Sequence, residues 1–79
     1  MNILNRVMKI ASKELEIPVE QVFPELSINT VESWDSLGHL NLILAIEEEF
    51  DVKFLTEEIP NLNSIKIITE AVEGKIKNV

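Results

Sequence analysis

The sequence predicts an all-α fold: a small bundle of three main helices plus one short helix, with a long first loop. Three segments of the 79-residue chain carry apolar residues at helical spacing, and a stretch with two prolines separates the first two. The chain is 46% hydrophobic and 27% charged, which is typical of a globular domain rather than a disordered tail. We therefore expect residues 1–79 to form a single domain with one modest core.

The first helix is expected over Asn2 to Glu16. Its apolar face comprises Ile3, Val7, Ile10 and Leu15, and its cations Arg6, Lys9 and Lys13 lie elsewhere. A basic amphipathic helix can lie on a membrane surface, but the interspersed glutamates favour a helix packed on the core. Ile17-Pro18 should end it, because the residue before proline disfavours helical conformation.

The first loop is expected from Ile17 to Trp34, with a possible short turn of helix around Val19 to Val22. Loops of this length are uncommon in compact domains unless side chains pin them or they have a function. The expected pins are Val22, Phe23, Leu26, Ile28 and Val31. Trp34 is expected to pack at the end of the loop, although indoles are also enriched at protein interfaces.

The central helix is expected from Trp34 to Phe50, with Asp35 and Ser36 where N-cap residues belong. At about 3.6 residues per turn, its apolar residues divide between two faces. One face carries Leu37, Leu40 and Leu44, and the opposite face carries Leu42, Ile43, Ile46 and Phe50. The bulkier stripe that ends in Phe50 is assigned to the core. The other stripe, with acidic residues at its far end, predicts a docking surface; the alternative is a helix buried on both sides.

After Phe50, Thr56 can cap a short helical turn that Pro60 should end. Asn63 or Ser64 then caps the last helix, in which Ile65, Ile68, Val72 and Ile76 recur at helical spacing.

The formal net charge of −7 is concentrated around the central helix. Residues 30–58 hold eight acidic residues against Lys53 alone, whereas the acids and bases of the remaining chain balance. Such a surface would repel nucleic-acid phosphates and attract basic protein partners, although an acidic face can also serve solubility alone. The chain has no cysteine, no apolar signal core and no apolar run as long as a membrane span, so we expect a cytoplasmic protein.

Two kinds of chemistry were weighed against these features. Ser36 and His39 lie three residues apart on a helix beside Asp35, but such a small chain offers little cleft for a catalytic triad, so no catalytic residue is assigned. A metal site from Glu47, Glu48 and Asp51 is also not expected, because helical spacing spreads these carboxylates.

The triplet Asp35-Ser36-Leu37, opening a helix that ends in the residues AIEEEFD, resembles the acyl carrier proteins. The resemblance covers nearly the whole chain. It implies that Ser36, supported by Asp35, receives 4′-phosphopantetheine from coenzyme A, and that an acyl or aminoacyl group is carried on this arm as a thioester. A helix N-terminus tolerates the phosphodiester well, because its N–H groups and dipole favour an anion. The alternative is that the two residues only cap the helix.

The resemblance also implies partners: a phosphopantetheinyl transferase, a loading enzyme, and downstream transferases or synthases with basic docking surfaces. The expected docking residues are Leu37, Leu40, Leu44, Glu47 and Glu48, presented by a monomer as a helix that fits a groove. Gly38 and Asn41 stand where carriers of fatty-acid synthesis usually have acids, and Trp34 is more like free-standing carriers of specialised pathways. An acidic helical adaptor that is never modified is the competing hypothesis.

Overall fold

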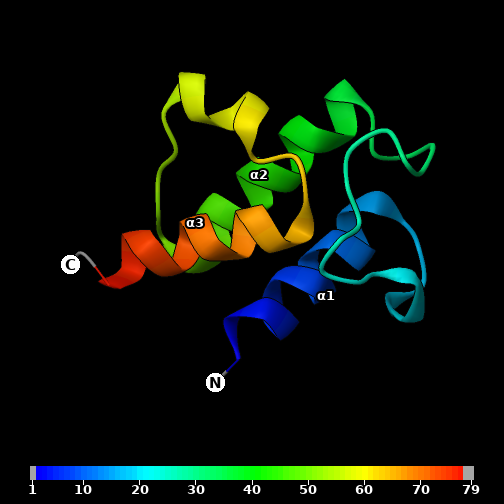
Figure 1. The fold of residues 1–79 in the computed structure, drawn as a ribbon, viewed down its shortest axis with the longest axis horizontal. Helices are drawn as coiled ribbons and strands as arrows, with labels where there is room; N and C mark the ends of the chain where they lie inside the picture. Colours follow the sequence, from blue (N-terminus) through cyan, green and yellow to red (C-terminus); the bar gives the residue numbers. More distant parts are fainter. Residues whose placement is uncertain (1, 78–79) are drawn as a thin grey trace.

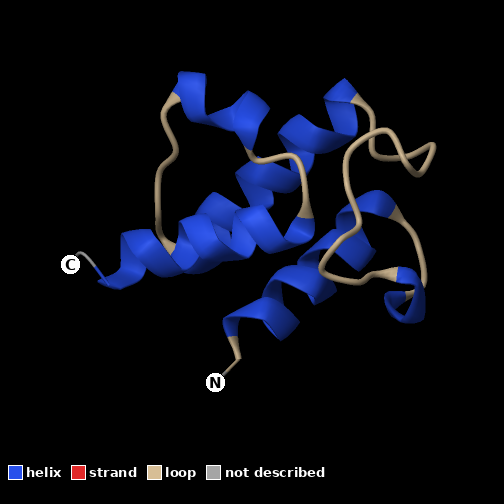
Figure 2. Cartoon of the chain, viewed as in Figure 1, coloured by secondary structure: helices blue, strands red, loops and turns tan. Residues whose placement is uncertain are grey.

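The computed structural model describes residues 2–77 and confirms the all-α prediction. Its three main helices are α1 (Ile3–Leu15), α2 (Ser36–Phe50) and α3 (Ile65–Lys77), and two short 3-10 helices lie between them, η1 (Val19–Gln21) and η2 (Thr56–Asn61). Helix α1 packs against both α2 and α3, while the long first loop covers one end of the bundle and η2 lies along another edge (Figures 1 and 2). Within the described residues, no helix has both the length and the apolar character needed to cross a membrane.

Helix α1 begins at an Asn2 cap, whose side-chain oxygen accepts a hydrogen bond from the Asn5 N–H at 3.2 Å. Val7, Ala11 and Leu15 are its buried residues, one above another at four-residue spacing, whereas Ile10 is only partly buried. The helix ends one residue earlier than predicted, and the proline is not the direct cause. Glu16 takes the left-handed conformation with φ of 56°, and its N–H donates to the Ser12 carbonyl.

The two faces of α2 are separated as the sequence predicts. Leu42, Ile43 and Ile46 are buried in the core, and Phe50 packs partly buried against it. The opposite face is exposed, which excludes a helix buried on both sides. The helix ends at Phe50. The next residue, Asp51, is its C-cap, adopts a φ of 55° and donates its N–H to the Glu47 carbonyl.

The first loop is held by its backbone as well as by apolar side chains. Ile65 N–H donates to the Leu26 carbonyl at 3.0 Å, and Lys66 N–H donates to the Pro24 carbonyl at 2.8 Å. These bonds satisfy N–H groups that the first turn of α3 would otherwise leave unpaired. Among the predicted pins, Val22 and Leu26 are buried, and Ile28 and Val31 are partly buried. The prediction for Phe23 was wrong, because its side chain is 47% exposed.

The segment after α2 differs from the prediction in two details. Leu55, not Thr56, occupies the cap position of η2, and the Glu58 carboxylate accepts the Leu55 N–H at 2.6 Å. The 3-10 helix continues through Pro60 to Asn61, because the observed bonds are donated by Glu58 and Leu62 and need no N–H from proline. Ser64 caps α3 by accepting the Ile67 N–H, as one of the two predicted alternatives. Ile65, Ile68 and Val72 are buried, whereas Ile76 is exposed.

Candidate attachment site at the start of the central helix

Ser36 is the first residue of α2, and its side chain is exposed. Asp35 caps the helix: its Oδ1 accepts the Gly38 N–H at 2.8 Å, and its own carbonyl accepts the His39 N–H at 2.8 Å. The two predicted residues therefore have different local roles, since one closes the helix end and the other presents a hydroxyl from the first turn. A group attached to this hydroxyl lies beside the positive end of the helix dipole, which favours an anion.

Trp34 lies before the first turn of α2 and His39 lies after it, and the two side chains contact each other. The Trp34 indole N–H donates to Nδ1 of His39 at 3.0 Å, and the two rings stack with centroids 6.1 Å apart. The other ring nitrogen, Nε2, lies 3.0 Å from the Ile59 carbonyl of η2. Both side chains are buried, so Trp34 packs within the fold rather than at an exposed interface, and His39 is a structural residue. Because both of its ring nitrogens are engaged, His39 is not placed to act as a base on Ser36.

Sequence reasoning placed Trp34 and His39 separately but did not pair them. The signal was available in their positions, because Trp34 directly precedes the N-cap and His39 is the fourth residue of the helix. These are the two positions of a hydrophobic staple, in which side chains across a helix start pack together and fix the angle of the incoming chain. Here a buried hydrogen bond is added to the packing.

Gly38 allows the loop to lie close against this turn. A Cβ added at residue 38 would lie 2.1 Å from the Ser33 carbonyl oxygen, well inside contact distance. The glycine found at this position is therefore required by the backbone that enters the helix, and it is not merely a missing charge.

The face of α2 that leads away from Ser36 is apolar and open to solvent. Leu37, Leu40 and Leu44 are 68%, 46% and 55% exposed. The acidic residues at the far end of the helix have distinct contacts. Glu47 accepts the Phe54 N–H at 2.8 Å and so holds the loop after the helix, whereas Glu49 pairs with Arg6. Glu48 is exposed.

Comparison with known proteins extends these local observations to the whole chain. No protein-family model matches the sequence. The chain is 37% identical over 76 residues to an acyl carrier protein of Buchnera aphidicola subsp. Schizaphis graminum, with 96% of each sequence covered. The chain belongs to the acyl carrier protein family. An acyl carrier protein of Thermosynechococcus vestitus is 34% identical over 74 residues, covering 94% of this chain and 91% of that protein.

The fold agrees with this family assignment. The solution structure of the holo acyl carrier protein of Geobacter metallireducens superposes with a TM-score of 0.85 at 27% identity, covering 99% of this chain and 90% of that chain. The predictions of an acyl-carrier-like fold and of family membership are therefore confirmed.

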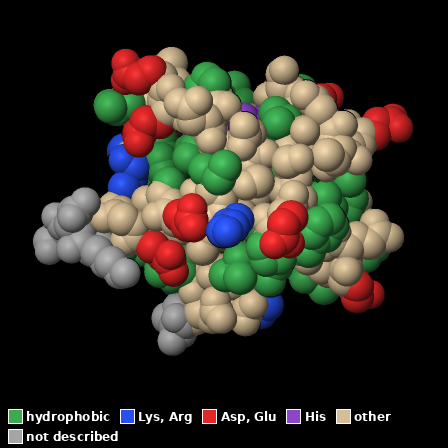
Figure 3. Space-filling model, in the orientation of Figure 1, with side chains coloured by type: hydrophobic (Ala, Val, Ile, Leu, Met, Phe, Trp, Pro, Cys, Tyr) green, Lys and Arg blue, Asp and Glu red, His purple; other side chains and the backbone are tan. Residues whose placement is uncertain are grey.

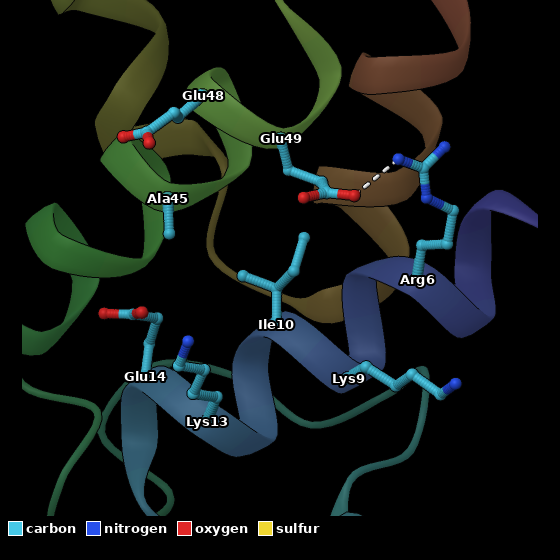
Figure 4. Close-up of a pocket in the computed structure, with 8 residues that line it drawn as sticks. All are labelled: Arg6, Lys9, Ile10, Lys13, Glu14, Ala45, Glu48 and Glu49. Carbon is cyan, nitrogen blue, oxygen red and sulfur yellow. Dashed lines mark hydrogen bonds and ion pairs between the residues drawn. The ribbon is translucent and has the colours of Figure 1, made fainter.

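Two open grooves flank α2 of this carrier-family chain. The first, of about 550 Å³, lies between α1 and the second half of α2 (Figure 4). Arg6 reaches across it to Glu49, and Ile10 and Ala45 lie between the two helices, whereas the Lys9 side chain extends away from Glu48 and Glu49. Arg6 also lies 4.5 Å from the centre of the Phe50 ring, so its guanidinium ties the two helices together. This groove is at the opposite end of α2 from Ser36.

The second groove lies beside the start of α2, where Asp35, Leu37 and Gly38 are among its lining residues. Its lining combines apolar side chains with carboxylates: Leu15, Ile17, Val31 and Leu37 with Glu14, Glu16, Glu32 and Asp35. In the space-filling view, acidic side chains and exposed hydrophobic side chains also share the face shown (Figure 3). The surroundings of Ser36 are therefore acidic, even though the first turns of α2 carry no carboxylate.

The Glu58 carboxylate lies beside both a backbone donor and a lysine. The hydrogen bond from the Leu55 N–H, with Lys75 beside it at 3.3 Å, holds the pKa of the Glu58 carboxyl below its ordinary value of 4.5. This carboxylate stabilises the start of η2, the segment that supplies the carbonyl bound by His39.

Proposed function

We propose that this protein carries an acyl or aminoacyl group on a 4′-phosphopantetheine arm joined to Ser36. The observation that carries the proposal is the exposed Ser36 hydroxyl at the N-terminus of α2, in a chain of the acyl carrier protein family. The residues present fit the group: Asp35 closes the helix end without covering the hydroxyl, and the helix dipole favours a phosphodiester there.

The arm would supply a thiol that holds the cargo as a thioester. The chain itself contributes attachment, presentation and docking, and performs no bond-making on the cargo. Tethering raises the effective concentration of the cargo at each partner enzyme, which replaces the need for a binding pocket of high affinity.

Docking is proposed for the apolar stripe of Leu37, Leu40 and Leu44 together with the exposed carboxylate of Glu48. An exposed helical stripe of this kind fits an apolar groove on a partner, and the acidic end fits basic residues at the rim of that groove. Glu47 adds negative charge to the same end, although its carboxylate also holds the Phe54 N–H.

Intact mass after incubation with coenzyme A and a broad-specificity phosphopantetheinyl transferase tests this function. We expect one added phosphopantetheine on the wild type and none on Ser36→Ala. Because Ser36 is exposed and Asp35 still caps the helix, the alanine variant should fold normally and serve as a matched control. No added mass under conditions that modify a known carrier would overturn the proposal and favour the unmodified adaptor.

We also propose that the partners belong to a specialised pathway rather than to housekeeping fatty-acid synthesis. Support comes from the first eleven residues of α2, Ser36 to Ile46, which contain no Asp, Glu, Lys or Arg. A partner that recognises acids on these turns would associate slowly with this chain, because charge complementarity sets much of the association rate.

Malonyl transfer by a fatty-acid-synthesis transacylase checks this pathway assignment. We expect the modified wild type to accept the group at least about tenfold more slowly than a fatty-acid carrier, and Asn41→Glu to recover part of the loss. Asn41 is exposed on α2, so the substitution should add charge without disturbing the core. Equal rates for the wild type and the fatty-acid carrier would contradict the assignment.

A further inference from the structure

Trp34 and His39, which lie on either side of Ser36 in the sequence, are joined by a hydrogen bond that points to a role for His39 beyond packing. We propose that His39 is a positioning residue of the carrier site. It joins the end of the first loop to η2 and thereby sets the direction in which Ser36 is presented to the transferase. The inference rests on the proposed attachment at Ser36, but it concerns residues that the attachment itself does not use.

The first support is the closed loop of contacts around the attachment residue. The side-chain bond from Trp34 to His39 spans residues 34 to 39, so it encloses Asp35 and Ser36 between its two ends. The backbone is held as well, because the Asn29 N–H donates to the Trp34 carbonyl at 2.8 Å. An N-cap alone fixes where a helix begins, whereas a staple also fixes the path of the chain that enters it.

The second support is the hydrogen-bonding state that the two partners impose on the imidazole. An indole N–H can only donate, so Nδ1 of His39 must accept, and the ring proton then lies on Nε2. Nε2 can therefore donate to the Ile59 carbonyl at 3.0 Å. A single neutral tautomer thus satisfies both neighbours, and the ring has one orientation that does so.

The third support is that the two bonds have separable consequences. The bond to Trp34 acts on the segment that contains Ser36, whereas the bond to Ile59 acts on η2, which is twenty residues further along the chain. If His39 is a positioning residue, loss of the first bond should slow transfer to Ser36 more than loss of the second. If His39 contributes only to stability, loss of either hydrogen bond should change the rate of transfer to Ser36 to the same extent.

Two substitutions of His39, each of which keeps one of its two hydrogen bonds, test this proposal. In His39→Asn the amide oxygen can take the place of Nδ1 and accept from Trp34, while the reach to Ile59 is lost. In His39→Gln the amide N–H₂ can reach towards Ile59, while the acceptor for Trp34 is lost. His39→Ala loses both bonds. Thr69→Val is the control for lost stability alone, because Thr69 is buried and its hydroxyl donates to the Ile65 carbonyl within α3.

The measurements are the thermal midpoint of each variant and the kcat and KM of phosphopantetheine transfer at saturating coenzyme A. We expect His39→Gln and His39→Ala to lower kcat/KM about tenfold, since small misplacements of a reacting group cost up to about a hundredfold. His39→Asn should rescue most of that loss, although its thermal midpoint falls as well. Thr69→Val should lower the midpoint with transfer kept at the wild-type rate.

Trp34→Phe keeps the test valid if a His39 variant does not fold. It removes the indole N–H together with part of the buried ring, so its thermal midpoint should fall as well. It should reproduce the slow transfer of His39→Gln, with little further loss of transfer rate when the two changes are combined. Equal transfer rates for His39→Asn and His39→Gln, or transfer by Trp34→Phe at the wild-type rate, would overturn the positioning role while leaving the carrier function intact. Failure to modify the wild type would overturn the carrier function itself, and the inference with it.

Discussion

Gly38 and Gly74 provide a direct test of how the loop meets α2. Both glycines lie within helices, where replacing glycine by alanine usually stabilises a protein by about 1 kcal/mol. Their surroundings differ. A Cβ at residue 38 would lie 2.1 Å from the Ser33 carbonyl oxygen, whereas a Cβ at residue 74 meets no heavy atom within 4 Å. The two substitutions are therefore expected to have opposite signs.

The magnitude for Gly38→Ala follows from which atom must move. The obstructing atom belongs to the backbone of Ser33, two residues before Asp35, so relief requires the loop to shift rather than a side chain to rotate. Overpacking of this kind costs about 1–3 kcal/mol, which exceeds the gain in helix propensity. We expect net destabilisation by about 1 kcal/mol for Gly38→Ala, from these two opposing terms, and stabilisation by up to about 1 kcal/mol for Gly74→Ala.

Thermal and urea unfolding of the two variants, measured beside the wild type, test whether the two stability changes have opposite signs. For a domain of this size, about 1 kcal/mol moves the thermal midpoint by roughly 4–8 °C, so the two variants should separate clearly. A Gly38→Ala protein as stable as Gly74→Ala would refute the close approach of Ser33 to the helix. It would also remove the structural reason for glycine at this position.

Other consequences of the fold can be measured in the same way. Leu42→Ala, which empties a fully buried site, should cost about 2–5 kcal/mol in urea unfolding, whereas Leu44→Ala on the exposed face should change stability by less than about 0.5 kcal/mol; similar losses would contradict the assignment of the two faces. The lowered pKa of Glu58 predicts a contribution to stability that is present above the ordinary pKa of 4.5 and lost as the pH falls through the lower folded value. The thermal midpoint of Glu58→Gln should therefore approach that of the wild type on acidification, and a difference that stays constant down to the lowest pH would count against the hydrogen bond from Leu55.

The local pattern of the sequence was sufficient for the helices and for the division of α2 into two faces. Apolar spacing depends only on helix geometry, so it placed Leu42, Ile43 and Ile46 in the core and left Leu37 exposed. The same reasoning was less reliable where the choice among neighbouring residues depends on the partner helix. It named Ile10 for the buried face of α1, whereas Ala11 occupies the fully buried position and Ile10 is partly buried.

Helix ends were predicted from proline and cap residues. The predicted positions were nearly right, but the structure ends the helices by a different mechanism. Glu16 and Asp51 end their helices in the left-handed conformation, a geometry for which glycine is the usual signal. Pro60 lies inside η2, because a 3-10 helix with bonds at three-residue spacing does not need its N–H. At these three positions the residue type alone did not predict whether the helix would end or continue.

What the sequence determined by itself was the order of the helices, the position of Ser36 and the family in which such a serine is expected. What only the tertiary structure decided were the contacts between segments distant in the chain: the first loop on the start of α3, Glu47 on Phe54, and His39 on Ile59. Periodicity reports which way a side chain faces, because that depends on its own helix. A hydrogen-bond partner depends on which segments the folded chain brings together, so a local sequence pattern cannot predict that partner.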